Sequence, residues 1–277
     1  MSENLKALAY KLRIDTIDII MAGGGGHIGG DMSVMEILTD LYFRQMKVSP
    51  ENPEDPDRDY FIMSKGHSME AYYAVLCEKG FLDLADVKAR FSKFDSPYIG
   101  HPHNTLPGIE MNSGSLGHGL PVAVGLALAA KKRQKNNRVY VVTGDGELAE
   151  GSNWEGFMSG AMFGLDNLCC IIDRNRLQIS GCTEDVMALD DLKAKVTAFG
   201  WNVISLQDGN DIDEIDAAFE QAKTVKGKPT CIIANTVKGK GSEVMENKAG
   251  WHHKVPSEEQ YQQIMKDLTE KKEALLA

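Results

Sequence analysis

The chain has 277 residues, of which 43% are hydrophobic and 25% are charged, the composition of an ordinary globular protein. This length suffices for one large α/β domain with a sizeable core, and a second full domain would not fit comfortably. Thirty basic and forty acidic residues give a net charge of −10, which argues against nucleic acid or an anionic membrane as the main partner, so any bound phosphate must be held by a local site.

Cysteine usage and the lack of long apolar runs indicate the compartment. The five cysteines are odd in number, contain no C-x-x-C pair, and include two neighbours inside an apolar stretch: Cys77, Cys169, Cys170, Cys182 and Cys231. This pattern predicts buried free thiols in a reducing compartment. No run of residues approaches the length of a membrane span, and residues 1–6 lack the apolar segment of a signal peptide. We therefore expect a cytoplasmic protein without membrane contact.

The first part of the chain predicts two helices, a strand and a third helix. Apolar positions recur at helical spacing over residues 5–21 and again over 32–46, on either side of a glycine run. A polar loop with two prolines follows over residues 52–58. Residues 59–63 then predict a strand, and a helix that ends at Lys79 comes after it.

The rest of the chain alternates helices with apolar strands. We predict helices over 121–133 and 147–163, an acidic helix between the last two strands, and strands over 139–143, 168–172, 201–205 and 231–235. This alternation is typical of an open, mostly parallel sheet with helices on both faces. Neither a repeat nor a linker divides the sequence, so the prediction is an α/β fold in a single domain over residues 1–277.

A Gly-Asp-Gly turn follows the predicted strand 139–143. Gly144 and Gly146 leave the backbone uncovered there, so that a phosphate could approach closely. The helix expected from residue 147 would direct its first amides at that anion. Asp145 lies at the carboxyl end of the strand, the usual ligand position in an open α/β sheet. The alternative is an ordinary strand-to-helix turn, which is common for an isolated Gly-Asp-Gly.

A second apolar strand, 168–172, runs into Asp-Arg-Asn175. If the two strands are neighbours in the sheet, Asn175 emerges beside Asp145. Mg²⁺ prefers oxygen ligands such as carboxylates, carbonyls and phosphates. The Asp145 carboxylate, the Asn175 amide and the main-chain carbonyl of Leu177 could supply three of them, which leaves room for a diphosphate and water. A capping role for Asn175 is the alternative, and the paired motifs make it the weaker one.

These two motifs resemble the thiamine diphosphate binding motif, and five further segments are similar to segments of the transketolase family. They follow the family's order and span almost the whole chain: Gly-Gly-His27-Ile-Gly-Gly, Ser-Lys-Gly-His67, Gly-His101-Pro-His-Asn-Thr-Leu-Pro-Gly, Gly114-Ser-Leu-Gly-His-Gly119 and Gly-Trp-His252-His. The resemblance implies thiamine diphosphate as the cofactor, together with Mg²⁺ or another divalent cation.

The resemblance also implies roles for the histidines. His67 and His252 match residues that contact the cofactor diphosphate, and His27 and His101 match residues that face the substrate; we expect His27, His101 and His252 to take part in catalysis. Imidazole can donate a hydrogen bond to a phosphate or a sugar hydroxyl and can move a proton near neutral pH. His253 is adjacent to His252, which we choose because it directly follows a tryptophan as in the family pattern. Without the resemblance, a histidine beside a glycine is more often a turn residue.

Four other residues match cofactor positions of the family. Gly114 and Leu116 match residues that hold the aminopyrimidine ring, Gly146 belongs to the diphosphate motif, and Glu150 matches an acidic residue that helps to join subunits around the cofactor. Two alternatives remain. The segment from Gly114 could be a flexible start of the next helix, and Glu150 could be a solvated acid favoured by the helix dipole.

The resemblance implies half of an enzyme. A full transketolase has a further domain that grips the aminopyrimidine ring and supplies a glutamate to it, and nothing in this sequence is similar to that domain. We expect the N-terminal subunit of a split transketolase, active only with a C-terminal subunit that carries the pyrimidine-binding domain, as an α₂β₂ heterotetramer. A fragment of a longer protein is the alternative. The expected reaction transfers a two-carbon ketol unit (glycolaldehyde) from a ketose phosphate to an aldose acceptor.

Three departures from the family pattern leave the sugar open. Ile28 replaces a proline, Asp31 introduces a carboxylate where a small residue is common, and His118 replaces a frequent glutamine. These positions are expected near the cofactor and the acceptor channel. Pentose phosphates of ordinary carbohydrate metabolism are therefore one expectation, and a branched, shortened or sulfonated sugar is another.

Three other functions compete with this one. The thiamine-binding subunit of a 2-oxoacid dehydrogenase, or a related lyase, shares the Gly-Asp-Gly motif but would not be expected to carry His27, His67 and His101. An NAD-binding module is disfavoured because no G-x-G-x-x-G lies between an early strand and a helix. A non-catalytic paralogue is disfavoured because Asp145, Asn175 and the histidines are all present.

Overall fold

The computed structural model describes residues 2–277, which form one five-stranded sheet and one short two-stranded ribbon. All neighbours in the larger sheet are parallel, and its three central strands are almost fully buried, which is typical of parallel sheets. In spatial order its strands are β1 (Tyr60–Met63), β2 (Val139–Gly144), β3 (Leu168–Asp173), β7 (Thr230–Ala234) and β6 (Asn202–Leu206). The ribbon pairs β4 (Leu177–Gln178) with β5 (Gly181–Cys182) in antiparallel fashion.

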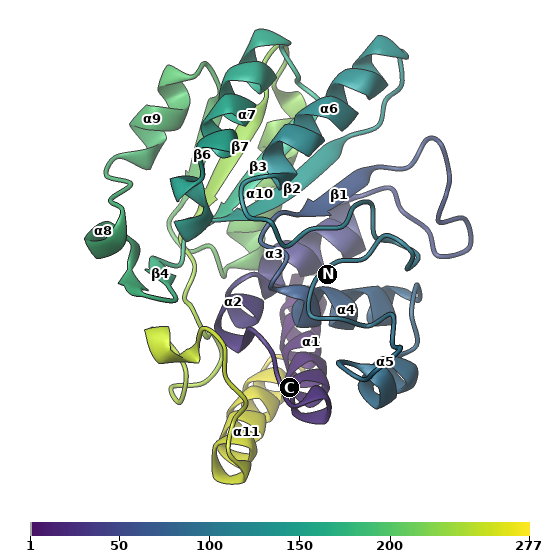
Figure 1. The fold of residues 1–277 in the computed structure, drawn as a ribbon, viewed down its shortest axis with the longest axis vertical. Helices are drawn as coiled ribbons and strands as arrows, with labels where there is room; N and C mark the ends of the chain where they lie inside the picture. Colours follow the sequence, from purple (N-terminus) through teal and green to yellow (C-terminus); the bar gives the residue numbers. More distant parts are fainter. Residues whose placement is uncertain (1) are drawn as a thin grey trace.

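Helices cover both faces of the sheet, as predicted (Figure 1). Alternate strand residues point to opposite faces, so Tyr140 and Val142 join one core while Val139 and Val141 join the other. The first core is completed by α1 (Ser2–Gly23), α3 (Met35–Asp40), α4 (Met69–Lys79) and α10 (Ile212–Thr224). The second is completed by α6 (Gly119–Lys132), α7 (Gly151–Met162) and α9 (Leu192–Ala198).

A third apolar cluster joins the two ends of the chain. The helix α11 (Glu258–Ala274) packs along α1 through Ile264 and Leu268, and α2 (Ile28–Ser33) closes the cluster through Ile28 and Met32 (Figure 1). The remaining elements are η1 (Leu41–Gln45), α5 (Leu84–Arg90), η2 (Gly146–Ala149), α8 (Thr183–Val186) and η3 (Ala249–Trp251).

Two helices that we predicted as continuous are each divided into shorter helices in the structure. The helix expected over 32–46 is divided into α2, α3 and η1, because the Ser33 hydroxyl turns inward and donates to the Asp173 carboxylate at 2.6 Å. The helix expected over 147–163 is interrupted at Glu150, which is extended, so α7 does not begin at the Gly-Asp-Gly turn. In both places a buried polar contact with the sheet overrides the apolar periodicity that the sequence shows.

Two structural observations bear on the predictions of free thiols and of no membrane span. Within residues 2–277, no helix is both long and apolar enough to cross a membrane. All five cysteines are free, and Cys169, Cys170 and Cys231 are buried in the sheet, whereas Cys77 and Cys182 are half-buried. The prediction of free thiols is confirmed, and burial is confirmed for the three strand cysteines.

Candidate active site

A cavity of about 310 Å³ lies at the carboxyl ends of four strands, β1, β2, β3 and β7. Parallel strands bring all their carboxyl ends to one edge, so segments far apart in sequence converge there. Its lining contains every predicted site residue except Glu150: His27, His67, His101, Gly114, Leu116, Asp145, Gly146, Asn175, Leu177 and His252. It also contains residues that the sequence analysis did not single out as ligands: Gly30, Lys65, Gly144, Glu147, Gln178, Ile179 and Lys238.

The Gly-Asp-Gly turn and the Asp-Arg-Asn segment are neighbours, because Gly144 pairs with Asp173 in register. Asp145 is buried there, and both of its oxygens accept hydrogen bonds. Oδ1 accepts from the Gly146 amide at 2.8 Å, and Oδ2 accepts from the Arg176 amide at 2.6 Å and from Arg174 Nη1 at 3.0 Å. Burial, with the nearby Asp173 charge, raises the pKa of Asp145 above its usual range. These bonds fix the carboxylate at the edge of the cavity.

Asn175 and Leu177 bring two more oxygens to the same wall. Asn175 Oδ1 accepts from the Leu177 amide at 3.1 Å, while the Leu177 carbonyl accepts from Lys238 Nζ at 3.0 Å. A carboxylate, an amide and a carbonyl are the oxygen types that suit a hard cation. Nowhere in residues 2–277 do three His, Cys, Asp or Glu side chains gather as a metal site.

Two buried lysines, which the sequence analysis missed, give the cavity its positive charge. Lys65 donates to the Gly30 carbonyl at 2.9 Å and forms an ion pair with Asp173. Lys238 Nζ lies 3.0 Å from His252 Nδ1, and burial, together with the Lys65 charge, lowers the pKa of Lys238 to about 8. Lys65 stands inside the quoted Ser-Lys-Gly-His67 segment, and Lys238 follows β7, so both had a positional signal in the sequence.

Three other histidines of the cavity surround the ring of His27. Its centroid lies 5.2 Å from that of His67, 5.6 Å from that of His252 and 6.1 Å from that of His101. Burial, helped by neighbouring positive charge, lowers the pKa of His27 to about 4 and of His252 to about 3. The same causes hold the pKa of His67 well below its ordinary value, and burial alone lowers the pKa of His101. These imidazoles are therefore neutral at pH 7 and can either donate or accept a hydrogen bond.

The two adjacent histidines, His252 and His253, differ in position. His252 lines the cavity and is half-buried, whereas His253 is exposed and lies outside the lining. The His253 ring still packs against that of His27, with centroids 4.6 Å apart.

Glu147 braces the loop that carries Gly114 and Leu116. Its buried carboxylate accepts from the Gly117 amide at 2.8 Å and from the Gly144 amide at 3.0 Å, so it ties this loop to the end of β2. Gly114 has φ 134°, and a Cβ there would lie 2.9 Å from His101 Cδ2. Only glycine fits that close approach without strain.

Glu150 is the one predicted site residue that the structure does not bring to the cavity. It is exposed, in the break between η2 and α7, and its Cβ lies beside Gly117. A contact between Glu150 and a ligand of the cavity is therefore not seen within this chain.

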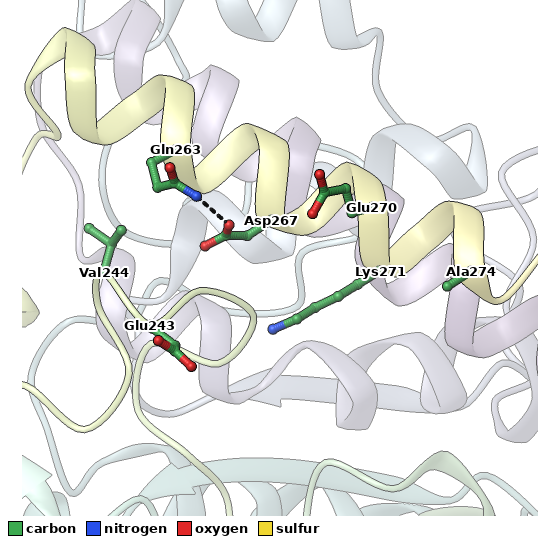
Figure 2. A pocket seen from close by; sticks show the side chains of 7 residues that line it. All are labelled: Glu243, Val244, Gln263, Asp267, Glu270, Lys271 and Ala274. Atoms are coloured by element: carbon green, nitrogen blue, oxygen red, sulfur yellow. Dashed lines mark hydrogen bonds between the residues drawn. The ribbon is translucent and has the colours of Figure 1, made fainter.

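A second, larger depression carries no comparable chemistry. It measures about 630 Å³ and lies between α11 and the loop of Glu243 (Figure 2). Acids and one lysine line it, and the lysine, Lys271, donates to the Gly241 carbonyl at 2.9 Å. No predicted site residue reaches it.

Comparisons with known proteins agree with this geometry. The family model described as "Transketolase, thiamine diphosphate binding domain" matches residues 5–274. The chain is 45% identical to one of the subunits of the apulose-4-phosphate transketolase of Phocaeicola vulgatus, over 99% of this chain and 96% of that protein. It is 40% identical to 6-deoxy-6-sulfo-D-fructose transketolase subunit SqwG of a Clostridium species, over 96% of each.

A solved structure shows the same fold. The transketolase of Campylobacter jejuni superposes with a TM-score of 0.90 at 32% identity, over 97% of this chain and 42% of that one. The sequence match, the parallel sheet and the cavity at its edge agree with one another. This chain belongs to the transketolase family, and it spans the family's thiamine diphosphate binding domain.

Proposed function

We propose that this chain is the N-terminal subunit of a two-subunit transketolase, which transfers a two-carbon ketol unit from a ketose phosphate to an aldose acceptor. One observation carries the proposal: the oxygens of Asp145, Asn175 and Leu177, two lysines and four histidines meet in a single cavity. We further propose that residues 1–277 form one domain and that the protein works in the cytoplasm.

The proposed ligands are thiamine diphosphate and Mg²⁺, and the donors present fit both. Asp145, Asn175 and the Leu177 carbonyl would hold the cation, with phosphate oxygens completing its shell. Lys238 would share the Leu177 carbonyl, which has two lone pairs. The Lys238 ammonium, which lines the cavity, would neutralise part of the diphosphate charge.

The remaining cofactor contacts follow from the positions of the other lining residues. His67 and His252 would donate hydrogen bonds to the diphosphate, because both line the lysine side of the cavity. Gly114, Leu116 and Gly146 would form the wall against the aminopyrimidine and the phosphates.

Thiamine diphosphate, when bound, supplies the thiazolium carbon that accepts the ketol unit. The work of this chain is to orient the sugar and to move protons. His27 and His101 present neutral imidazoles to the cavity, so each can take a proton from a sugar hydroxyl or return one to the reacting oxygen.

The proposed partner is a C-terminal subunit that carries the pyrimidine-binding domain, in an α₂β₂ heterotetramer. Two relatives matched over 96% of their length bear names that describe them as subunits, and this chain covers 42% of the Campylobacter transketolase. The exposed Glu150 is proposed to face that partner. The names of the same relatives mention apulose-4-phosphate and 6-deoxy-6-sulfo-D-fructose, which favours a sugar of one of these kinds over an ordinary pentose phosphate as the substrate.

A reconstitution experiment tests the proposed function. The chain is mixed with its partner subunit, thiamine diphosphate and Mg²⁺, and two-carbon transfer is assayed from a panel of linear and branched ketose phosphates and a sulfonated ketose. We expect transfer from at least one of them and no decarboxylation of pyruvate. Pyruvate decarboxylation without transfer would favour the 2-oxoacid dehydrogenase function and contradict the proposal.

A further inference from the structure

Two carboxylic acids lie buried behind the histidines of the cavity. Asp31 is 0% exposed and Glu70 is 1% exposed. Asp31 follows His27 by four residues in α2, and Glu70 follows His67 by three residues in the first turn of α4. Buried acids cost free energy unless they are paired or protonated, so a pair at this place requires an explanation.

The two side chains connect the loops of the two histidines. Asp31 Oδ1 accepts from the Ala71 amide, in α4, at 3.1 Å. The Glu70 carboxyl lies within hydrogen-bonding reach of the His27 main-chain amide and of the Asp31 carboxyl. Contacts therefore run in both directions, from α2 to α4 and from α4 back to the start of α2.

Asp31 Oδ2 and Glu70 Oε2 are both buried without a hydrogen-bond partner among the residues that the structure describes. A hydrogen bond between the two acids would satisfy both, and it requires a proton. Ionised carboxylates only accept, so one of the two must carry the hydrogen. Burial raises the pKa of Asp31 to about 7, and burial together with the Asp31 charge raises the pKa of Glu70 well above its usual range.

Few charged groups act on this pair. Lys65, from the end of β1, is the cation that favours the ionised form of Asp31. Tyr73, one turn further along α4, is neutral, because burial raises its pKa above the usual range. Towards α1 the pair meets apolar packing, since Ile20 and Glu70 Oε1 both lie beside Gly26. One positive charge opposite two acids fits a pair that holds one negative charge and one proton.

The backbone of His27 is held on both sides by these loops. Its amide faces the Glu70 carboxyl, and its carbonyl accepts from the amides of Gly30 at 3.0 Å and Asp31 at 3.2 Å. Its ring nitrogen Nδ1 is buried and has no partner within residues 2–277. The His27 ring is therefore fixed through its main chain and by ring packing, and its Nδ1 takes no part in fixing it.

We propose that Asp31 and Glu70 are positioning residues, whose shared proton clamps the His27 loop to the His67 loop and so sets the His27 ring over the cavity. Neither acid lines the cavity, so neither touches the substrate or the cofactor. The clamp acts through the main chain of His27. This inference rests on the proposed function only where two-carbon transfer is measured.

Isosteric and truncated variants separate the shared proton from simple packing. In Asp31→Asn the amide hydrogens donate to an ionised Glu70, and in Glu70→Gln they donate to an ionised Asp31, so the clamp is retained without a shared proton. Asp31→Ala and Glu70→Ala remove it. We expect the alanine variants, assembled with partner and cofactor, to lose roughly 10- to 100-fold in kcat for two-carbon transfer. Their affinity for thiamine diphosphate should change much less, and the amide variants should stay close to the wild type.

Two further readouts do not depend on activity. Nitrogen-15 signals of the His27 imidazole, assigned with His27→Gln, should move in the alanine variants and stay in place in the amide variants. Infrared difference spectra at pH 7 should show one protonated carboxyl lost in Asp31→Asn, one lost in Glu70→Gln, and no additional loss in the double amide variant. If the proposed transfer reaction itself fails, these two readouts still test the clamp.

Asp40 provides a matched control, because it is a buried acid whose pKa burial also raises to about 7, and it bonds Gln45 in η1 away from the cavity. Asp40→Ala should lower stability yet leave the His27 signals and kcat unchanged. Unchanged His27 signals in Glu70→Ala would overturn the clamp. If the alanine variants do not fold, amide variants with displaced His27 signals, or without the infrared difference, would overturn it as well.

Discussion

The wall formed by the ends of β2 and β3 and the group of histidines opposite it are built in different ways. Both oxygens of Asp145 accept hydrogen bonds from main-chain and arginine donors, and the Asn175 side chain accepts from the Leu177 amide. His27, in contrast, keeps a buried ring nitrogen that has no partner in the described chain. A wall that is already hydrogen-bonded is suited to holding a fixed ligand, whereas neutral imidazoles with free nitrogens are suited to groups that change during a reaction.

The largest expected effect lies at the hydrogen-bonded wall. Asp145→Ala removes the one carboxylate among the proposed cation ligands. Loss of a residue that only hydrogen-bonds to a metal ligand already lowers affinity roughly 10- to 100-fold, so we expect a loss of more than ~100-fold in Mg²⁺-dependent affinity for thiamine diphosphate. Calorimetry on the assembled complex measures it. Asp166→Ala, before the opposite end of β3, is the control and should leave affinity unchanged. Equal affinity for thiamine diphosphate in Asp145→Ala and Asp166→Ala would show that the wall at Asp145 does not hold the cofactor.

The next effect separates chemistry from binding at the histidines. His27→Ala and His101→Ala should lower kcat for two-carbon transfer roughly 100-fold, the usual scale for loss of a general acid or base, with a smaller change in cofactor affinity. Steady-state kinetics and cofactor titration on the same samples give both quantities. His103→Ala, two residues from His101 and outside the lining, should behave like the wild type. Equal losses in kcat and affinity would place these histidines with the binding wall instead.

Lys238 links the two regions and gives a dependence on pH. Because the pKa of Lys238 is lowered to about 8, about half of the ammonium groups have lost their proton at pH 8. A bound diphosphate favours the charged form. Binding then takes up a proton, so affinity for thiamine diphosphate should fall by up to about tenfold per unit above pH 8. Titrations between neutral and alkaline pH measure the slope. Lys238→Met should bind weakly at every pH and lose this slope; a wild-type affinity that stays constant above pH 8 would argue against the role of the ammonium.

The smallest effect is expected at Glu150, which belongs to neither region. Because it is exposed, Glu150→Ala should change the stability of the isolated chain by no more than ~0.5 kcal/mol. The affinity of Glu150→Ala for the partner subunit, measured by analytical ultracentrifugation, should fall. Glu155→Ala on α7 is a matched exposed control. Unchanged association in Glu150→Ala would leave this residue as a solvated acid.

The sequence predicts the hydrogen-bonded wall better than the groups around it. Strands are short apolar runs, so the places where they end, and with them Asp145 and Asn175, can be read from the pattern. The break at Glu150 and the division of α2 from α3 could not be predicted, because they depend on buried contacts between residues far apart in the sequence. Glu147 bonds Ser64 and Gly117, and Ser33 bonds Asp173.

Lys65, Lys238 and the Asp31–Glu70 pair escaped notice for a related reason. In a sequence, lysine and acidic residues are expected on the surface, because they are rarely buried without a partner. The fold supplies such partners here: Asp173 for Lys65, and a second acid for Asp31. Asp31 stands out in the sequence as a departure from the family pattern, but its partner Glu70 lies 39 residues away and no periodicity connects them.

The measurement that tests the account most directly is activity with and without the partner. The chain is purified alone and together with the C-terminal subunit, and two-carbon transfer from a ketose phosphate to an aldose is assayed with thiamine diphosphate and Mg²⁺ present. We predict no turnover by the chain alone, turnover by the mixture, and tighter cofactor binding on mixing, because the partner buries the apolar rings. Robust turnover by the isolated chain would contradict the account.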